Sequence, residues 1–166
     1  TEVSMDGGNT WLPADGPAHV DVEPNPPPIV TTNPDLPPGE GHYVSPAEWH
    51  QAYANGIVIK GVSHERFTGS NPTPPVDSTR DHTFGSSVRG QVSMDGGLTF
   101  APVSLGGPVG VRVRHTHDDG SDSFFDTEML SLDLAGPGVM IRESPTLPSK
   151  GRTSIRMVNP GQYQIS

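Results

Sequence analysis

The stretch VSMDGGNTW at residues 3–11 recurs almost unchanged as VSMDGGLTF at residues 92–100. Each copy reads Ser-x-Asp-x-Gly-x-Thr and ends in an aromatic residue, which we expect to pack beneath a turn. Glycine tolerates positive φ, and an aspartate carboxylate can accept hydrogen bonds from backbone N–H groups. The repeat therefore predicts two β-hairpins. Their key residues are Ser4, Asp6, Gly8, Thr10 and Trp11 in the first copy and Ser93, Asp95, Gly97, Thr99 and Phe100 in the second.

The similarity extends beyond the turns, since TWLPADGPAHVDV (residues 10–22) aligns with TFAPVSLGGPVGVRV (residues 99–113). Duplication of one hairpin with its following strand is the simplest explanation. Residues 1–22 then form an N-terminal unit of their own. Residues 23–44 are rich in proline and are predicted to run extended, as a linker that can span roughly 60 Å at about 3.1 Å per residue. Residues 45–166 make up the body.

Glycine and proline dominate the composition. The 166 residues include 20 glycines and 19 prolines, and only 31% are hydrophobic. These proportions disfavour helices and favour short strands joined by turns. Alternation of apolar and polar residues supports strands throughout the body. The sequence predicts an all-β fold, an antiparallel β-sandwich. The predicted inward-facing residues include Val109, Val111, Val113, Leu130, Leu132, Leu134, Ile155, Met157, Tyr163 and Ile165.

One short helix is predicted over residues 46–54. Ser45 has the position of an N-cap, Pro46 suits the first helical turn, and Glu48 completes a capping box. Asn55 and Gly56 provide a stop signal.

The repeated pattern resembles the Asp box, a hairpin motif of sialidases and of many unrelated β proteins. In those proteins the motif is structural and lies away from the active site, so the resemblance implies no catalytic activity. A sialidase-type propeller also needs several four-stranded blades and many more than 166 residues. The two stretches are therefore interpreted as structural turns.

Charge and composition argue against several classes of function. A net charge of −9 disfavours nucleic-acid binding, which requires a basic surface. No apolar run is long enough for a membrane span, and the absence of cysteine removes thiolate chemistry. No nucleophile elbow or phosphate-binding loop is present. We expect a non-enzymatic protein without a cofactor. Its acidic character, and a start (TEVSM) that resembles a trimmed product, favour an extracellular or cell-surface location.

Both ends of the chain are predicted to be strands, TEVSM at the start and GQYQIS at the end. Open strand edges pair with each other or with another copy. The run from FFDTEMLSLDL to GQYQIS, together with the VSMDGG hairpins, is similar to uncharacterised secreted β-rich proteins of environmental bacteria. In those proteins a GQY-type strand runs almost directly into such a hairpin. The resemblance implies that the C-terminal strand and the N-terminal hairpin belong side by side.

A head-to-tail fibre satisfies both edges, because the terminal segment of one subunit completes the sheet of the next. The expected partner is another copy of the chain. The assembly residues would be Val3, Met5, Trp11, Val20, Val22, Tyr163 and Ile165. The alternative is a monomeric carbohydrate-binding or adhesion module, whose exposed aromatic residues would be Tyr43, Trp49 and Tyr53.

Two further patterns concern metal binding and modification. In the acidic segment HDDGSDSFFD (residues 117–126), Asp118, Asp119 and Asp122 could give oxygen ligands to Ca²⁺, but the EF-hand spacing is missing. A plain acidic turn is the other interpretation. Serines and threonines in proline-rich loops are candidate O-glycan carriers. These are Thr31, Thr32, Thr73, Ser78 and Thr79.

Overall fold

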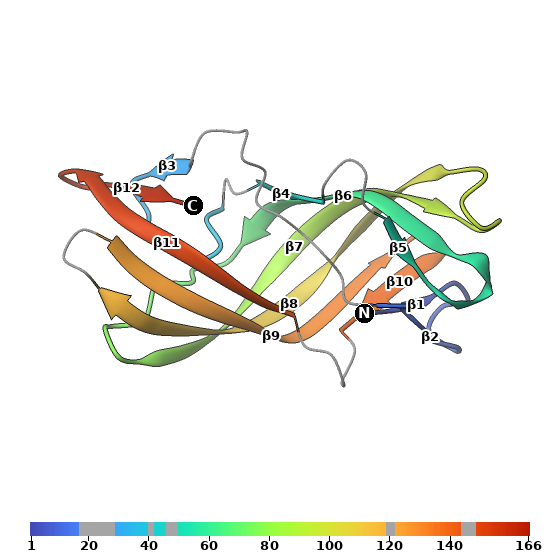
Figure 1. The fold of residues 1–166 in the computed structure, drawn as a ribbon, viewed down its shortest axis with the longest axis horizontal. Coiled ribbons are helices and arrows are strands. Elements are labelled where there is room, and N and C mark those ends of the chain that lie inside the picture. Colours follow the sequence, from blue (N-terminus) through green and yellow to red (C-terminus); the bar gives the residue numbers. More distant parts are fainter. Residues whose placement is uncertain (17–28, 40–41, 46–49, 119–121, 144–148) are drawn as a thin grey trace.

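The all-β prediction is confirmed by a computed structural model (Figure 1). The structure describes residues 1–16, 29–39, 42–45, 50–118, 122–143 and 149–166. Among these residues the strands are β1 (Glu2–Ser4), β2 (Leu12–Pro13), β3 (Ile29–Thr31), β4 (His42–Val44), β5 (His50–Ala52), β6 (Val58–Thr68), β7 (Thr79–Ser93), β8 (Ala101–Asp118), β9 (Asp122–Gly136), β10 (Val139–Arg142), β11 (Lys150–Asn159) and β12 (Gln162–Ile165).

All of these strands belong to one antiparallel sheet that curls over. Long strands β6, β7, β8 and β9 pair in sequence order and form its centre. Beyond β9 the sheet divides, because residues 133–136 pair with β10 while residues 122–128 pair with β11. Strand β6 divides in the same way and pairs with β4 and β5 along one side. The sheet therefore has two halves, one ending in β1 and β2 and the other in β12 and β3.

Two hydrophobic clusters correspond to the two halves. The larger one is built around residues of β6 to β10 and includes Val3 from the N-terminal strand. The smaller one contains Leu36, Val113, Phe125, Ile155 and Ile165. The core is thus assembled from segments far apart in the sequence, including both ends of the chain.

The proline-rich segment contributes two of the shortest strands. Among the described strands, β3 pairs with β12 alone and β4 with β6 alone, so both lie at edges of the sheet. Edge positions suit a proline-rich segment, because proline cannot donate to a central ladder.

The predicted helix over residues 46–54 is wrong where the structure describes it. Residues 50–52 form β5, and only Ala54–Gly56 forms a 3₁₀ turn, η1. Ser45 pairs with a strand instead of capping a helix. Its N–H donates to the Val62 carbonyl (2.8 Å), and its hydroxyl accepts from the Val62 N–H (2.9 Å). Pairing with β6 overrides the local helix signals. Residues 46–49 lie outside the described residues.

Strand alternation is confirmed for most positions, with two exceptions. Leu130 is exposed because the β8–β9 register shifts between Gly110 and Val111, so that Leu130 is left out of the register. Met157 shares a face with buried Ile155 but is 61% exposed, because it lies beyond the end of the core.

Close packing of β8 against β9 depends on Gly107. A Cβ at this position would overlap the Asp133 carbonyl oxygen, whereas a Cβ at Gly106 would meet nothing closer than 3.6 Å. Gly107→Ala should therefore push the two strands apart and destabilise the fold by about 3 kcal/mol or more. Chemical denaturation measures this loss. Gly106→Ala is the matched control, and equal stability of the two variants would contradict the predicted close approach.

Candidate functional site

The candidate site is the place where the N-terminal hairpin, defined as residues 1–15, joins the rest of the sheet. Strand β1 pairs with β10 through three residue pairs, from Glu2 with Arg142 to Ser4 with Met140. On the other side, Ala14 forms a β-bridge with Tyr53, and the Asp15 N–H donates to the carbonyl of Ala52 (3.0 Å). The hairpin therefore lies between β10 and the end of β5, and it closes this half of the sheet into a continuous circuit of strands.

Side chains anchor the hairpin at both of its edges. Val3 is completely buried in the larger hydrophobic cluster. Glu2 Oε2 accepts a hydrogen bond from Arg142 Nε (2.6 Å) within an ion pair. At the opposite edge, the Thr1 and Tyr53 hydroxyl groups lie 2.9 Å apart. Apolar, ionic and hydrogen-bonding contacts thus all hold this short segment in place.

The β1–β2 turn, residues 5–11, has the geometry that the sequence pattern predicts. Ser4 Oγ donates to Asp6 Oδ1 (2.9 Å) and accepts from the Gly8 N–H (2.8 Å). The Asp6 carboxylate also accepts from Thr10, whose N–H donates to Oδ1 (2.9 Å) and whose hydroxyl donates to Oδ2 (2.6 Å). Gly7 and Gly8 have positive φ values of 74° and 89°. The Ser4 and Asp6 side chains therefore accept hydrogen bonds from backbone N–H groups of their own turn.

The β7–β8 turn, residues 94–100, repeats the same network. Ser93 Oγ donates to Asp95 Oδ1 (2.7 Å) and accepts from the Gly97 N–H (2.9 Å). Thr99 again donates from its N–H (2.9 Å) and its hydroxyl (2.6 Å) to the Asp95 carboxylate. The Leu98 N–H is a further donor to that carboxylate (3.0 Å).

Each turn holds its aspartate in the ionised form. Hydrogen bonds from the Thr10 hydroxyl and N–H, and then from Ser4, lower the pKa of Asp6 to about 2. The equivalent bonds from Thr99 and Ser93 hold the pKa of Asp95 well below its usual range. The carboxylates are thus parts of the turns and are fully engaged by their own chain.

The aromatic residue that ends each repeat lies beneath a cation from the neighbouring strand. The Arg142 guanidinium carbon lies 4.1 Å from the centre of the Trp11 ring, and Lys60 Nζ lies 3.8 Å from that of Phe100. Such contacts contribute about 0.5–1 kcal/mol at exposed sites and more where they are desolvated. Trp11 Nε1 also donates to the Gly8 carbonyl (3.1 Å).

These two cations occupy equivalent positions. Arg142 comes two residues after the register partner of Ser4, and Lys60 comes two residues after the register partner of Ser93. The duplication therefore includes the docking of each hairpin on its neighbour as well as the turn itself. Sequence reasoning missed both cations, because only the strand register brings them to the aromatic rings.

The remaining predicted assembly residues are also engaged within the chain. Met5 packs against the larger cluster, Ile165 is buried in the smaller one, and Tyr163 packs against it. Strand β12 lies between β11 and β3, in the half of the sheet away from the N-terminal hairpin (Figure 1). The two terminal segments are therefore not side by side within one chain. Val20 and Val22 lie outside the described residues.

The acidic segment near residue 120 is described only in part. Asp122 forms an ion pair with Arg156 (3.4 Å between Oδ1 and Nε). Asp119 and the side chain of Asp118 lie outside the described residues. Within the part of the chain that the structure describes, no three acidic or histidine side chains are grouped to hold a metal ion.

The glycan candidates differ in their exposure. Thr31 is buried, and its Oγ1 accepts the Asn33 N–H (3.1 Å), so this hydroxyl is inaccessible to a glycosyltransferase. Thr32 and Thr79 are exposed, and Thr73 is half-buried. Ser78 donates its hydroxyl to the Pro75 carbonyl (2.7 Å).

Tyr53 is not the exposed aromatic residue that a carbohydrate site would need. It is only 6% exposed and belongs to the larger cluster, and burial raises the pKa of its phenol. Trp49 and the side chain of Tyr43 lie outside the described residues.

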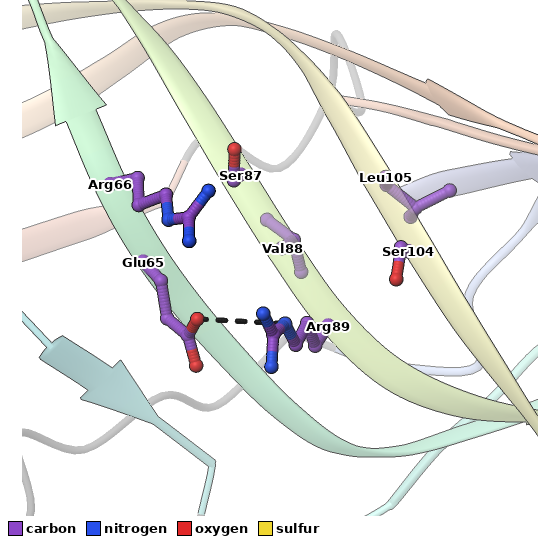
Figure 2. Close-up of a pocket in the computed structure, with 7 residues that line it drawn as sticks. All are labelled: Glu65, Arg66, Ser87, Val88, Arg89, Ser104 and Leu105. Carbon is purple, nitrogen blue, oxygen red and sulfur yellow. Dashed lines mark ion pairs between the residues drawn. The ribbon is translucent and has the colours of Figure 1, made fainter.

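A shallow polar hollow of about 240 Å³ crosses β6, β7 and β8 (Figure 2). Arg89 Nε lies 3.6 Å from Glu65 Oε2, and this ion pair bridges the two neighbouring strands. Ser87 and Ser104 also line the hollow. A cross-strand charge pair of this kind supports sheet pairing.

Comparisons with protein-family models, with curated proteins and with solved structures found no match. None of the residues that the structure describes forms a helix of the length and apolarity needed to cross a membrane.

The turn carboxylates predict how stability depends on pH. Because folding lowers their pKa, they stabilise the protein above about pH 4, the unfolded value, and this contribution is lost as the pH falls towards 2. Burial lowers the pKa of His64 to about 4, so protonation of this side chain favours the unfolded state. The resulting loss of stability occurs at higher pH, as the pH falls from about 6.5 to 4. Asp6→Asn and Asp95→Asn should therefore flatten the pH dependence of the unfolding free energy below pH 4.

Denaturant titrations between pH 5 and 2 measure this slope. Leu98→Asn is the control, because it changes a turn without altering its carboxylate. Wild-type slopes in both aspartate variants would contradict the role assigned to the carboxylates.

Proposed function

We propose that this chain is a non-enzymatic extracellular structural protein, the protomer of a head-to-tail fibre in which the N-terminal hairpin of one subunit docks in the next. The observation that carries the proposal is the closure of the sheet by this hairpin between β10 and β5. Its acidic charge and its resemblance to secreted β-rich proteins support the extracellular location.

The hairpin is suited to exchange between subunits because its contacts do not depend on which chain supplies it. Its strand pairs, the burial of Val3 and the Glu2–Arg142 ion pair can form within one chain or between two identical chains. Removing the hairpin would open the β10 edge and the end of β5, and open edges favour pairing with another chain. Exchange of an identical element is a low-cost route to assembly.

The placement of the hairpin and of β3 favours an open chain of subunits. The hairpin lies in one half of the molecule, and β3, the next described strand, lies in the other half (Figure 1). Residues 16–28 can span up to about 45 Å at roughly 3.3–3.6 Å per residue. If this segment instead extends away from its own subunit, the same span can bring the hairpin to the docking site of a second subunit stacked end to end. Such a heterologous contact can repeat from subunit to subunit without closing into a ring, which gives a filament.

A disulfide test distinguishes docking within a chain from docking between chains. The chain has no cysteine, so an engineered pair is unambiguous. Glu2→Cys with Arg142→Cys replaces two residues that are register partners. If the hairpin is exchanged, oxidation of the assembled protein should give a ladder of covalent oligomers on a non-reducing gel.

The matched control is Asp81→Cys with Arg112→Cys, which replaces another cross-strand ion pair between register partners, one that lies within the central sheet. This control should give monomers only. A monomeric band from the Glu2/Arg142 pair at high protein concentration, with no filaments by electron microscopy, would overturn the fibre proposal.

A further inference from the structure

The core-facing side of the β11–β12 hairpin continues beyond the core. Ile155 and Ile165 are register partners and are buried in the smaller cluster. The next pair on the same face is Met157 with Tyr163, where Met157 is 61% exposed and Tyr163 half-buried. Val158 beside them is 39% exposed. Met157 therefore presents an apolar side chain to solvent, beside half-buried Tyr163, at a position where alternation directs side chains inward.

The β7–β8 turn exposes apolar side chains that its N-terminal copy does not. Leu98 is 85% exposed and Met94 is 56% exposed. The equivalent residues of the first copy are Asn9, whose side chain donates to the Asp6 carbonyl (2.8 Å), and Met5, which packs against the core. The second copy thus presents to solvent two apolar groups that contribute little to its own fold.

These two apolar groups lie at opposite ends of the molecule. The turn between β11 and β12 forms one end of the long axis, and the turn between β7 and β8, drawn in yellow-green, lies at the other (Figure 1). The β7–β8 turn also borders the docking site of the N-terminal hairpin, because the Gly96 N–H donates to the Gly56 carbonyl (2.9 Å) in η1, just after β5.

We propose that the Met157–Tyr163 face of one subunit receives the β7–β8 turn of the neighbouring subunit, with Leu98 and Met94 packing against it. The inference rests on the proposed fibre and adds a second contact to the joint between subunits. The occupant is a second copy of this chain, because β3, the first described strand after the hairpin, pairs with β12, so the connection of the hairpin to the fold starts from this half of the molecule. A neighbour that receives the hairpin would bring its β7–β8 turn to the same end.

Burial of Leu98 in the joint makes a measurable contribution to assembly. Leu98→Asn gives the second turn the residue found in the first, and the side chain it replaces is exposed, so the fold of the subunit is retained. Transfer of a leucine side chain from water favours assembly enough that the variant should need about tenfold more protein to form fibres. Leu130→Asn, at another exposed leucine away from both ends, is the control and should leave this concentration unchanged.

A second cysteine pair tests the contact directly. Leu98→Cys with Met157→Cys in the full-length protein should give a ladder of covalent oligomers on oxidation, whereas Leu130→Cys with Met157→Cys should not. Fibres that form without this ladder, and that are insensitive to Leu98→Asn, would overturn the contact and leave hairpin exchange intact. A chain that forms no filaments, and whose cysteines introduced at positions 2 and 142 bond only within one molecule, would overturn both.

Discussion

The curled sheet depends on one closure, the insertion of the N-terminal hairpin between β10 and the end of β5. Strand edges leave backbone N–H and C=O groups without partners, and such groups are costly wherever water is excluded. The hairpin satisfies two edges at once and adds completely buried Val3 to the larger cluster. A short segment at the start of the chain therefore determines whether this half of the sheet is closed.

The duplicated unit has two different roles in one molecule. In the β7–β8 copy, both strands continue into the central sheet, so the unit is held by the chain on each side. In the N-terminal copy, the flanking strands β1 and β2 are short, and the position of the unit is maintained by the pairing of β1 with β10 and by the cation over its aromatic ring. The same local structure thus lies within the central sheet in one place and closes the sheet edge in the other.

Local signals predicted the turns and the alternating strands well, because their causes lie within a few residues. The Asp6 and Asp95 networks involve neighbours at most four positions away. The helix prediction at Ser45 was wrong because hydrogen bonds to Val62, 17 positions along the chain, decided the local conformation. The contact of Arg142 with Trp11 depends on strand register, which no short sequence window contains.

The remaining edges are built to limit uncontrolled pairing. Strands β3 and β4 have three residues each, and prolines 34, 37 and 38 follow β3 closely. Short edge strands flanked by proline are poor templates for added strands. The proposed fibre requires one specific joint between subunits and protection of the other sheet edges. The hairpin site meets the first requirement through its buried valine and its ion pair, and the proline-rich edges meet the second.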